Sequence, residues 1–317
     1  MNKKRGAGLL KEYMVFVLKG FCMGAADVIP GVSGGTMAFI MGIYERLIRA
    51  VSSFDLHFFS LIFSLRIREA FEHVSMAFLA CLGTGILLAI FSMARLLSWL
   101  LENRPVMIWS FFFGLIVASV YTVSRHMEAW RAVNMVWAAL GALITYLLVG
   151  MAPASTPDAP WFLFLSGAVA ICAMILPGIS GAFILVLLGK YLFVLEAVNN
   201  RDFVSLFIVA AGAALGLAAF SRLLKWCFKR HHDLIVALLT GLMTGSLRKV
   251  WPWKSAVRTI SDEKGHVVNS IQNNFLPSQW SMEVTFALLL AVAGFSLVIW
   301  LSIATRTKGS GLENINE

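Results

Sequence analysis

The sequence predicts an all-α polytopic membrane protein made of two inverted-topology repeats. Three observations lead to this fold class: an apolar composition, several apolar segments of membrane-spanning length, and one motif that occurs twice. Of the 317 residues, 59% are hydrophobic and 14% are charged, whereas soluble domains have about 45–50% and about 25%. A soluble chain this apolar could not cover its own surface, so an ordinary soluble domain and a disordered chain are excluded.

The net charge of +9 arises from 26 Lys and Arg against 17 Asp and Glu. No basic stretch is long or regular enough for a nucleic-acid interface, so no nucleic-acid partner is predicted. In a membrane protein such basic residues are expected on the cytoplasmic side. The four cysteines lie in or beside apolar segments and form no Cys-x-x-Cys pair, so they predict neither a metal site nor a redox pair.

Apolar segments of about 20 residues, the length that crosses a bilayer as a helix, recur along the chain. Six are predicted to span the membrane, 234–247 being the weakest: 75–101, 105–123, 132–150, 204–224, 234–247 and 282–304. Two further apolar regions, 9–49 and 161–196, contain the pairs Pro30-Gly31 and Pro177-Gly178. Because Pro and Gly disfavour a continuous helix, each region is predicted to be a re-entrant helical hairpin broken at membrane depth.

The link between the two halves is the stretch MAPASTPDAP at 151–160, which is rich in Pro and Ala. It is predicted to separate a first repeat, 1–150, from a second repeat, 161–305. Residues 306–317 are predicted to form a cytoplasmic tail. The longest polar stretch, 248–281, is predicted to be an irregular loop.

The motif that occurs twice indicates an internal duplication. Residues 28–42 read VIPGVSGGTMAFIMG and residues 175–189 read ILPGISGAFILVLLG, with Pro, Gly, Ser, Gly and a later Gly at the same spacing. Tyr44 and Tyr191 follow them. The similarity continues between RLLSWLL at 95–101 and RLLKWCF at 222–228, and Gly114 and Ser119 are matched by Gly241 and Ser246. The chain is therefore predicted to contain two copies of one unit.

The charges support an inverted second copy. Each unit has one hairpin and three spans, an odd number of crossings, so consecutive copies face opposite ways. With both termini in the cytoplasm, the inner segments hold 14 Lys and Arg residues, and the short outer links hold Arg104 and Arg201. The loop 248–281 disagrees, since its five basic residues fall outside: Arg248, Lys249, Lys254, Arg258 and Lys264. They either attract anionic head groups or are merely solvated.

Inverted repeats with discontinuous helices are typical of secondary transporters. Their exposed backbone groups are tolerated only inside protein or along a cavity, and a helix that begins after a break presents N–H groups to anions. Two facing sites for an anion such as phosphate are therefore predicted, with glycines allowing close backbone approach. The candidate residues are Pro30, Gly31, Ser33, Gly34, Gly35 and Thr36 in the first repeat and Pro177, Gly178, Ser180 and Gly181 in the second.

At these residues the chain resembles a known family. The stretches GAADVIPGVSGGTMAFIMGIYERLI (Gly24–Ile48) and ILPGISGAFILVLLGKY (Ile175–Tyr191) resemble the bacterial membrane family formerly known as domain of unknown function 368, now associated with polyprenyl-phosphate transport (PopT). The resemblance covers essentially the whole chain. It implies a multi-pass flippase of the bacterial cytoplasmic membrane that returns undecaprenyl phosphate to the inner leaflet for peptidoglycan precursor synthesis. Composition and spacing by themselves indicate only an anionic substrate.

Asp27 is the one acidic residue deep inside an apolar segment of the sequence, which makes it a functional candidate. It either binds a coupling proton or sodium ion, or orients the phosphate, or caps the second half of its hairpin. Its counterpart in the second repeat is Met174, so the hairpin itself does not require a carboxylate. Ser33 and Thr36 are likewise candidate phosphate donors or local caps.

Other charged residues are substrate candidates with plainer alternatives. Lys19 is a phosphate partner or pairs with a neighbour such as Glu12. Arg95 and Arg222 occupy corresponding positions and either bind a lipid phosphate or extend to the membrane interface. Glu45 and Arg46 form a gate or head-group contact, or a solvated pair.

Catalysis is not predicted, because the membrane motifs contain no nucleophile paired with a base and no cluster of carboxylates. No catalytic residue, metal site or cofactor is therefore predicted, apart from the possible ion coupling. The expected partners are the polyprenyl phosphate and membrane lipids, and no oligomeric state is predicted. Two alternatives stay open: a membrane enzyme acting on a lipid phosphate, and a small-anion transporter.

Overall fold

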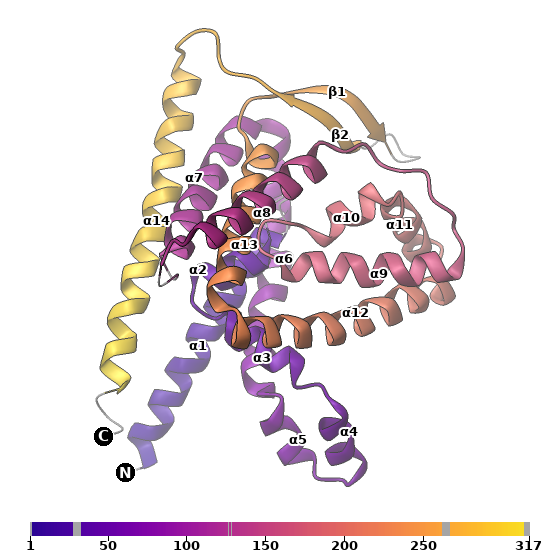
Figure 1. Ribbon diagram of the computed structural model, residues 1–317, viewed down its shortest axis with the longest axis vertical. Coiled ribbons are helices and arrows are strands. Elements are labelled where there is room, and N and C mark those ends of the chain that lie inside the picture. The colour runs from indigo at the N-terminus through magenta and orange to yellow at the C-terminus, as the bar shows by residue number, and fades with distance from the viewer. Residues whose placement is uncertain (1, 28–32, 126, 128, 262–266, 314–317) are drawn as a thin grey trace.

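The computed structural model describes residues 2–27, 33–125, 127, 129–261 and 267–313, and these are mostly helical (Figure 1). The first half contains α1 (Asn2–Asp27), α2 (Gly34–Ile40), α3 (Tyr44–Ser52), α4 (Leu56–Phe63), α5 (Ile67–His73), α6 (Met76–Asn103), α7 (Pro105–Ser124) and α8 (Ala132–Gly150). The second half contains α9 (Pro160–Ile175), α10 (Gly181–Leu187), α11 (Tyr191–Asn199), α12 (Phe203–Arg230), α13 (His232–Val250), β1 (Lys254–Ser261), β2 (Val267–Asn274) and α14 (Met282–Glu313).

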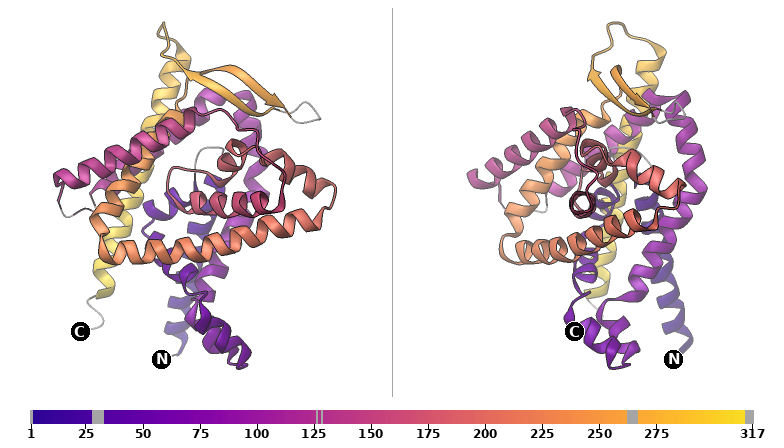
Figure 2. Two further views of the ribbon diagram at one scale, coloured as in Figure 1. Left: turned by 45° about the vertical axis from the view of Figure 1, so that its right-hand side comes forward. Right: turned by 90° about the vertical axis from the view of Figure 1, so that its right-hand side faces the viewer.

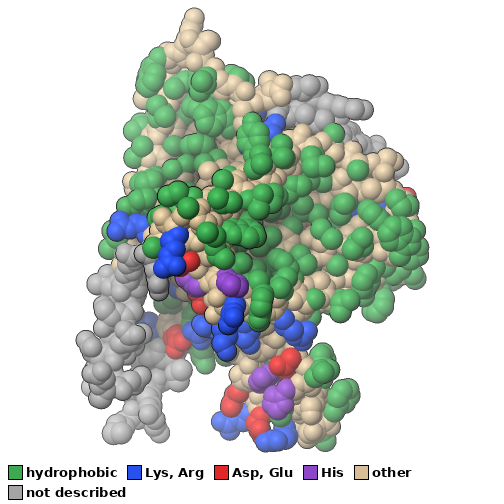
Figure 3. All heavy atoms as spheres, in the orientation of Figure 1, with side chains coloured by type: hydrophobic (Ala, Val, Ile, Leu, Met, Phe, Trp, Pro, Cys, Tyr) green, Lys and Arg blue, Asp and Glu red, His purple; other side chains and the backbone are tan. Residues whose placement is uncertain are grey.

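Five of the described helices are long and apolar enough to cross a membrane, so the chain is a multi-pass membrane protein. They are Met76–Met93, Pro105–Ser124, Ala132–Gly150, Phe203–Arg230 and Met282–Ile303. Their surfaces expose large apolar side chains such as Leu87 and Phe203, and apolar side chains cover most of the face in Figure 3. This is the surface that lipid, not water, would cover.

The sixth predicted span, 234–247, lies within the helix α13, which is less apolar than these five helices. Its surroundings explain the difference. α13 packs against both α7 and α8, and Val236, Leu239 and Met243 are completely buried. Since protein covers much of this helix, it can carry polar residues such as Thr240 and Ser246, which bond to carbonyls of their own helix.

The second Pro-Gly break is confirmed: α9 ends at Ile175, α10 begins at Gly181, and Gly178 between them has φ +90°. In the first repeat α1 ends at Asp27 and α2 begins at Gly34. Pro30 and Gly31 lie outside the described residues. α1 begins at Asn2, earlier than the predicted start of its hairpin at residue 9.

The segment that follows each break contains a second bend that the sequence analysis did not predict. Gly42 separates α2 from α3 with φ +66°, and Gly189 separates α10 from α11 with φ +64°. The chain bends by 105° between α10 and α11. Glycine adopts this left-handed conformation without a Cβ penalty, so a helix ends readily there. Each predicted second arm is therefore two short helices.

Apart from α4 and α5 in the first half and the β-hairpin in the second, the two halves repeat one order of helices, and they exchange helices. α1 packs on α6 as α9 packs on α12, whereas α7 packs on α14 and α13 on α8, each from the other half (Figure 2). Close backbone approach permits this exchange: a Cβ on Gly114 would meet the carbonyl of Ala291, and a Cβ on Gly241 would meet the carbonyl of Ala138. The halves are thus interlocked and do not form separate bodies.

The prediction of an irregular loop at 248–281 is wrong, because much of this segment is extended. β1 and β2 form an antiparallel hairpin with Lys254 opposite Asn274 and irregularities in the register. Alternating residues such as Ala-Val-Arg-Thr-Ile suit an extended strand. The hairpin lies at the end of the molecule opposite both termini (Figures 1 and 2).

A lobe formed by α4 and α5 was also not predicted. It projects at the end where both termini lie (Figure 1). Asp55 begins it by accepting a hydrogen bond of 2.9 Å from the backbone N–H of Phe58, a typical helix cap. In Figure 3 the lobe carries acidic and His side chains beside its basic ones, whereas Lys and Arg gather across the adjacent lower body. Positive charge is therefore concentrated at the end opposite the β-hairpin on this face.

Candidate functional site

The two broken regions meet, as the sequence analysis predicts for their facing ends. The Ser33 hydroxyl donates to the carbonyl of Met174 at 3.2 Å, and the backbone N–H of Gly178 donates to Thr36 Oγ1 at 3.0 Å. Both side chains are 1% exposed. Tyr44, equally buried, donates its hydroxyl to the carbonyl of Ile175 at 3.2 Å. These contacts join residues more than 130 positions apart in the sequence.

The beginning of α2 is already capped by oxygen atoms of the chain itself. Asp27 Oδ1 accepts the N–H of Gly34 at 2.6 Å, and Ser33 Oγ accepts the N–H of Gly35 at 3.1 Å. This is the capping alternative considered for both residues. A phosphate that binds the N–H of Gly34 must displace the carboxylate of Asp27, so the first predicted anion site is occupied by the protein in this conformation.

The beginning of α10 is different. Among the described contacts, Ser180 occupies the N-cap position but makes no side-chain cap hydrogen bond, and Met174 stands where the first repeat has Asp27. Gly181 lies close to α9, since an added Cβ would meet the carbonyl of Ala170. The two predicted anion sites are therefore chemically unequal, and the second lacks the internal acid that fills the first.

An apolar cavity of about 250 Å³ lies beside Asp27. Its polar side is formed by Asp27 and the backbone of Gly34 and Gly35. Its other walls come from α1, α3, α6, α9 and α12 and consist of Met23, Leu47, Ile48, Val51, Leu79, Leu82, Gly83, Ile86, Ile171, Met174, Ile175 and Leu217. An apolar cavity with a few convergent polar groups at one side suits a largely hydrocarbon ligand with a polar end.

Lys19 and Arg46 both have protein partners. Lys19 Nζ donates to the carbonyl of Met41 at 2.8 Å, which lies at the end of α2, the negative end of its dipole. Arg46 lies 3.6 Å from Glu12 and stacks on the rings of Phe16 and Phe78, at 4.5 and 4.7 Å. Both side chains therefore hold the first hairpin together, whatever further role they have.

The remaining predicted charges are Glu45, Arg95 and Arg222. Glu45 is 3.9 Å from Arg49 and 3.5 Å from His232. Arg222 donates to the carbonyl of Phe54 at 2.8 Å, and Arg95 is exposed on α6. None of these predicted residues is among the described residues that line the cavity beside Asp27.

Comparison with known proteins identifies the family. The family model described as "Undecaprenyl phosphate translocase-like" matches residues 23–268, a range that contains both breaks and the segment between them. The chain belongs to this family. It is 40% identical over 305 residues to the polyprenyl-phosphate transporter of Vibrio cholerae serotype O1, covering 93% of this chain and 98% of the relative. It is 32% identical over 254 residues to the polyprenyl-phosphate transporter of Staphylococcus aureus, covering 74% and 85%. No solved structure matches the chain.

In this undecaprenyl phosphate translocase-like protein, the sequence did not predict an ion pair between the buried Lys190 and Asp158, whose side chain is 64% exposed. Lys190 is 2% exposed and donates to Asp158 Oδ1 at 2.5 Å and to the carbonyl of Thr156 at 2.8 Å. It thereby ties the link 151–160 to the bend between α10 and α11. The available signal was a lone lysine inside the apolar stretch ILVLLGKYLFVL together with the single acid of the link.

A basic cavity was also missed. It has a volume of about 260 Å³ and lies between α3 and the end of α12. Its described lining residues are Glu45, Ile48, Arg49, Lys225, Phe228 and Lys229. The sequence placed these cations on one side of the membrane, but only the contact of α3 with α12 brings them around one cavity. Among the residues that the structure describes, no group of three His, Cys, Asp or Glu side chains is placed to hold a metal ion.

Proposed function

We propose that this chain transports polyprenyl phosphate, specifically undecaprenyl phosphate, from the outer to the inner leaflet of the cytoplasmic membrane. The lipid would thereby return to the side where cell-wall precursors are made. The observation that carries this proposal is the junction of the two broken regions beside an apolar cavity, in a chain whose relatives are named polyprenyl-phosphate transporters. The lipid is moved and not converted.

The junction of the two broken regions supplies polar partners that the phosphate head group would not find in the hydrocarbon of the membrane. An ionised group transferred into an apolar medium without partners is strongly destabilised, and backbone polar groups inside a membrane need protein or a cavity around them. At the junction, the backbone of Gly34 and Gly35 lines an apolar cavity, and Ser33 caps the helix α2 that they begin. The phosphate would pass along the junction while the isoprenoid chain stays in the cavity or in lipid.

The movement is proposed to alternate between two inverted repeats. In support, the two halves repeat their element order and pack reciprocally, α7 on α14 and α13 on α8. We place both termini in the cytoplasm and the β-hairpin outside. The basic surface near the termini supports this orientation through the positive-inside rule. The basic cavity lined by Arg49, Lys225 and Lys229 would then receive the phosphate on the inner side.

Asp27 is proposed to couple transport to a proton or sodium gradient. It is the carboxylate that lines the cavity beside the junction, and its bond to Gly34 N–H links any change of its charge to the start of α2. Binding a cation at Asp27 would weaken this cap and free the N–H of Gly34 for the substrate phosphate. Cation binding and phosphate binding would then favour each other.

The test is a leaflet assay in proteoliposomes that carry fluorescent polyprenyl phosphate. We expect the protein to deplete the lipid from the leaflet on the hairpin side and Asp27→Asn to abolish gradient-driven depletion. Unchanged leaflet exposure with the wild-type protein would refute the proposed function. Release of inorganic phosphate would instead indicate a membrane enzyme, and phosphate flux without the lipid would indicate a small-anion transporter.

A further inference from the structure

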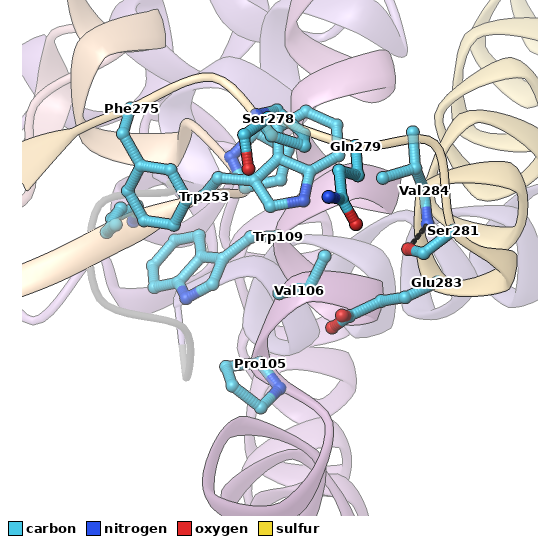
Figure 4. Close-up of a pocket in the computed structure, with 13 residues that line it drawn as sticks. Pro105, Val106, Trp109, Trp253, Phe275, Ser278, Gln279, Ser281, Glu283 and Val284 are labelled. Atoms are coloured by element: carbon cyan, nitrogen blue, oxygen red, sulfur yellow. Dashed lines mark hydrogen bonds between the residues drawn. The ribbon is translucent and has the colours of Figure 1, made fainter.

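A third cavity, of about 490 Å³, lies at the β-hairpin end, away from the junction of the breaks. It is enclosed by the start of α7, the base of the hairpin, the following loop and the start of α14. In Figure 4 the rings of Trp109, Trp253 and Phe275 form one wall, and Glu283 extends from α14 toward Val106. The described lining residues are Pro105, Val106, Trp109, Pro252, Trp253, Lys254, Phe275, Pro277, Ser278, Gln279, Ser281, Glu283 and Val284.

Lys254 gives this cavity its cation. Its Nζ lies 3.5 Å from the centroid of the Trp109 ring and donates to the backbone carbonyl of Lys249. Lys249, at the end of α13, in turn places its Nζ 5.1 Å from the centroid of the Phe183 ring on α10. A chain of contacts therefore runs from the outer cavity to the short helix that follows the second break.

Among the side chains that the structure describes, Lys249 and Lys254 form no ion pair with a carboxylate, and both are partly buried. Burial, and secondly the charge of Lys249, lower the pKa of Lys254 to about 6. An anion bound between the two amines would favour their charged forms and so oppose both the burial and the mutual repulsion. The lining carboxylate, Glu283, lies in the first turn of α14, where the helix dipole favours an acid.

We propose that Lys249 and Lys254 bind the phosphate of the lipid substrate where it enters the protein on the hairpin side. This inference rests on the proposed function. The aromatic and proline walls would hold the first isoprenoid units, since the cavity is larger than a phosphate requires and mostly apolar. From there the phosphate would pass along Lys249 and Phe183 to the start of α10. Two of the five basic residues of the segment 248–281 thereby receive a role in substrate binding.

The first experiment measures binding by the purified full-length chain in detergent, with farnesyl phosphate as the probe. We expect Lys254→Gln and Lys249→Gln each to weaken its binding about tenfold, because each removes a charged partner of the phosphate. Lys254→Arg retains a cation over Trp109 and should restore most of the affinity. Unchanged affinity in both glutamine variants would overturn the proposal, as would equal weakening by Lys254→Arg and Lys254→Gln.

The matched control is Arg248→Gln, which removes the same charge one position away. Arg248 donates to the carbonyl of Tyr146 at 2.9 Å and stacks on its ring at 4.3 Å, so it faces α8. The affinity of the Arg248→Gln variant for farnesyl phosphate should stay within about twofold of the wild-type value, since general surface charge contributes little here. Equal loss in Arg248→Gln would indicate unspecific attraction and contradict the proposal. Farnesol should bind weakly, and inorganic phosphate should show the same ranking of variants at lower affinity.

The second experiment separates this inference from the proposed function. In oriented proteoliposomes, Lys249→Gln/Lys254→Gln should raise the half-saturating concentration for polyprenyl phosphate presented on the hairpin side about tenfold or more. Transport of lipid presented on the opposite side should be unchanged at low concentration. If the wild type transports and the double variant matches it from both sides, the binding site is refuted and the function stands. If the wild type binds but does not transport, the function fails instead.

Discussion

At the scale of single residues, Asp27 shows how one acid differs between two otherwise matched segments. The first repeat has Asp27 where the second has Met174. The structure gives Asp27 a definite bond, to the N–H of Gly34 at 2.6 Å, and places it beside the apolar cavity. Capping and the proposed ion coupling therefore involve the same carboxylate, and variants must separate them.

Asp27→Ala should lower the free energy of unfolding by about 1 kcal/mol, because it removes a helix cap. Asp27→Asn retains an oxygen that accepts the N–H of Gly34, so its stability should stay close to that of the wild type. Thermal unfolding in detergent checks both. If the asparagine variant is stable yet inactive in the leaflet assay, the negative charge itself is needed. Full activity in this variant would remove Asp27 from the proposed coupling.

Lys190 is a second residue whose importance depends on its surroundings. Lys190→Met should lower the free energy of unfolding only slightly. Methionine fills a similar volume, and without the charge no buried ammonium is left to be paired. Asp158→Asn leaves the buried ammonium with the carbonyl of Thr156 and a neutral amide, so stability should fall by about 1–3 kcal/mol. The double variant should recover most of this loss. Additive effects of the two substitutions in unfolding measurements would contradict the coupling.

At the scale of elements, the bends after the two breaks provide a matched pair. Gly42 and Gly189 share a left-handed backbone, with φ +66° and +64°. A Cβ on Gly42 would meet nothing within 4 Å, whereas a Cβ on Gly189 would meet the carbonyl of Ala154 in the link. The two positions thus impose the same backbone strain but different steric demands.

Gly42→Ala should destabilise the protein by about 1–2 kcal/mol, the cost of a left-handed conformation for a residue with a Cβ. Gly189→Ala should destabilise the protein more than Gly42→Ala does, because the link 151–160 must also move. Unfolding temperatures of the two variants, measured under one condition, check the order. Equal values would show that the link does not restrain the bend between α10 and α11.

At the scale of the whole molecule, the exchange of helices between halves determines the architecture. α7 and α13 each pack against the last helix of the other half, and they contact each other. A repeat could not bury these faces by itself. The glycines at the crossings, Gly114 and Gly241, are the positions where this packing is least tolerant of added volume.

Gly114→Val should destabilise the protein by several kcal/mol and reduce transport, because its side chain would displace α14 at Ala291. Gly83→Val is the control, since a Cβ on Gly83 on α6 meets nothing within 4 Å. It should alter stability by less than about 1 kcal/mol. A similar loss in both variants, measured by unfolding and by yield in detergent, would mean that the crossing of α7 and α14 is not the sensitive contact.

Much of the architecture follows from the sequence by itself. Apolar length predicts the five spans, the Pro-Gly pairs predict breaks between helices, and the recurring motif predicts that the broken regions correspond and meet. These features depend on local composition and on spacing along the chain, which a sequence displays directly. The bends at Gly42 and Gly189 were missed because a glycine near a helix end does not reveal its φ angle.

Only the tertiary structure decided which groups meet. It assigned Asp27 to Gly34, Thr36 to Gly178 and Lys190 to Asp158. It also packed α13 against α7 and α8 and brought Lys254 against Trp109. Composition and spacing determine that a segment is apolar, broken or basic. The partner of a polar group depends on which helices cross, and here those helices come from opposite halves of the chain.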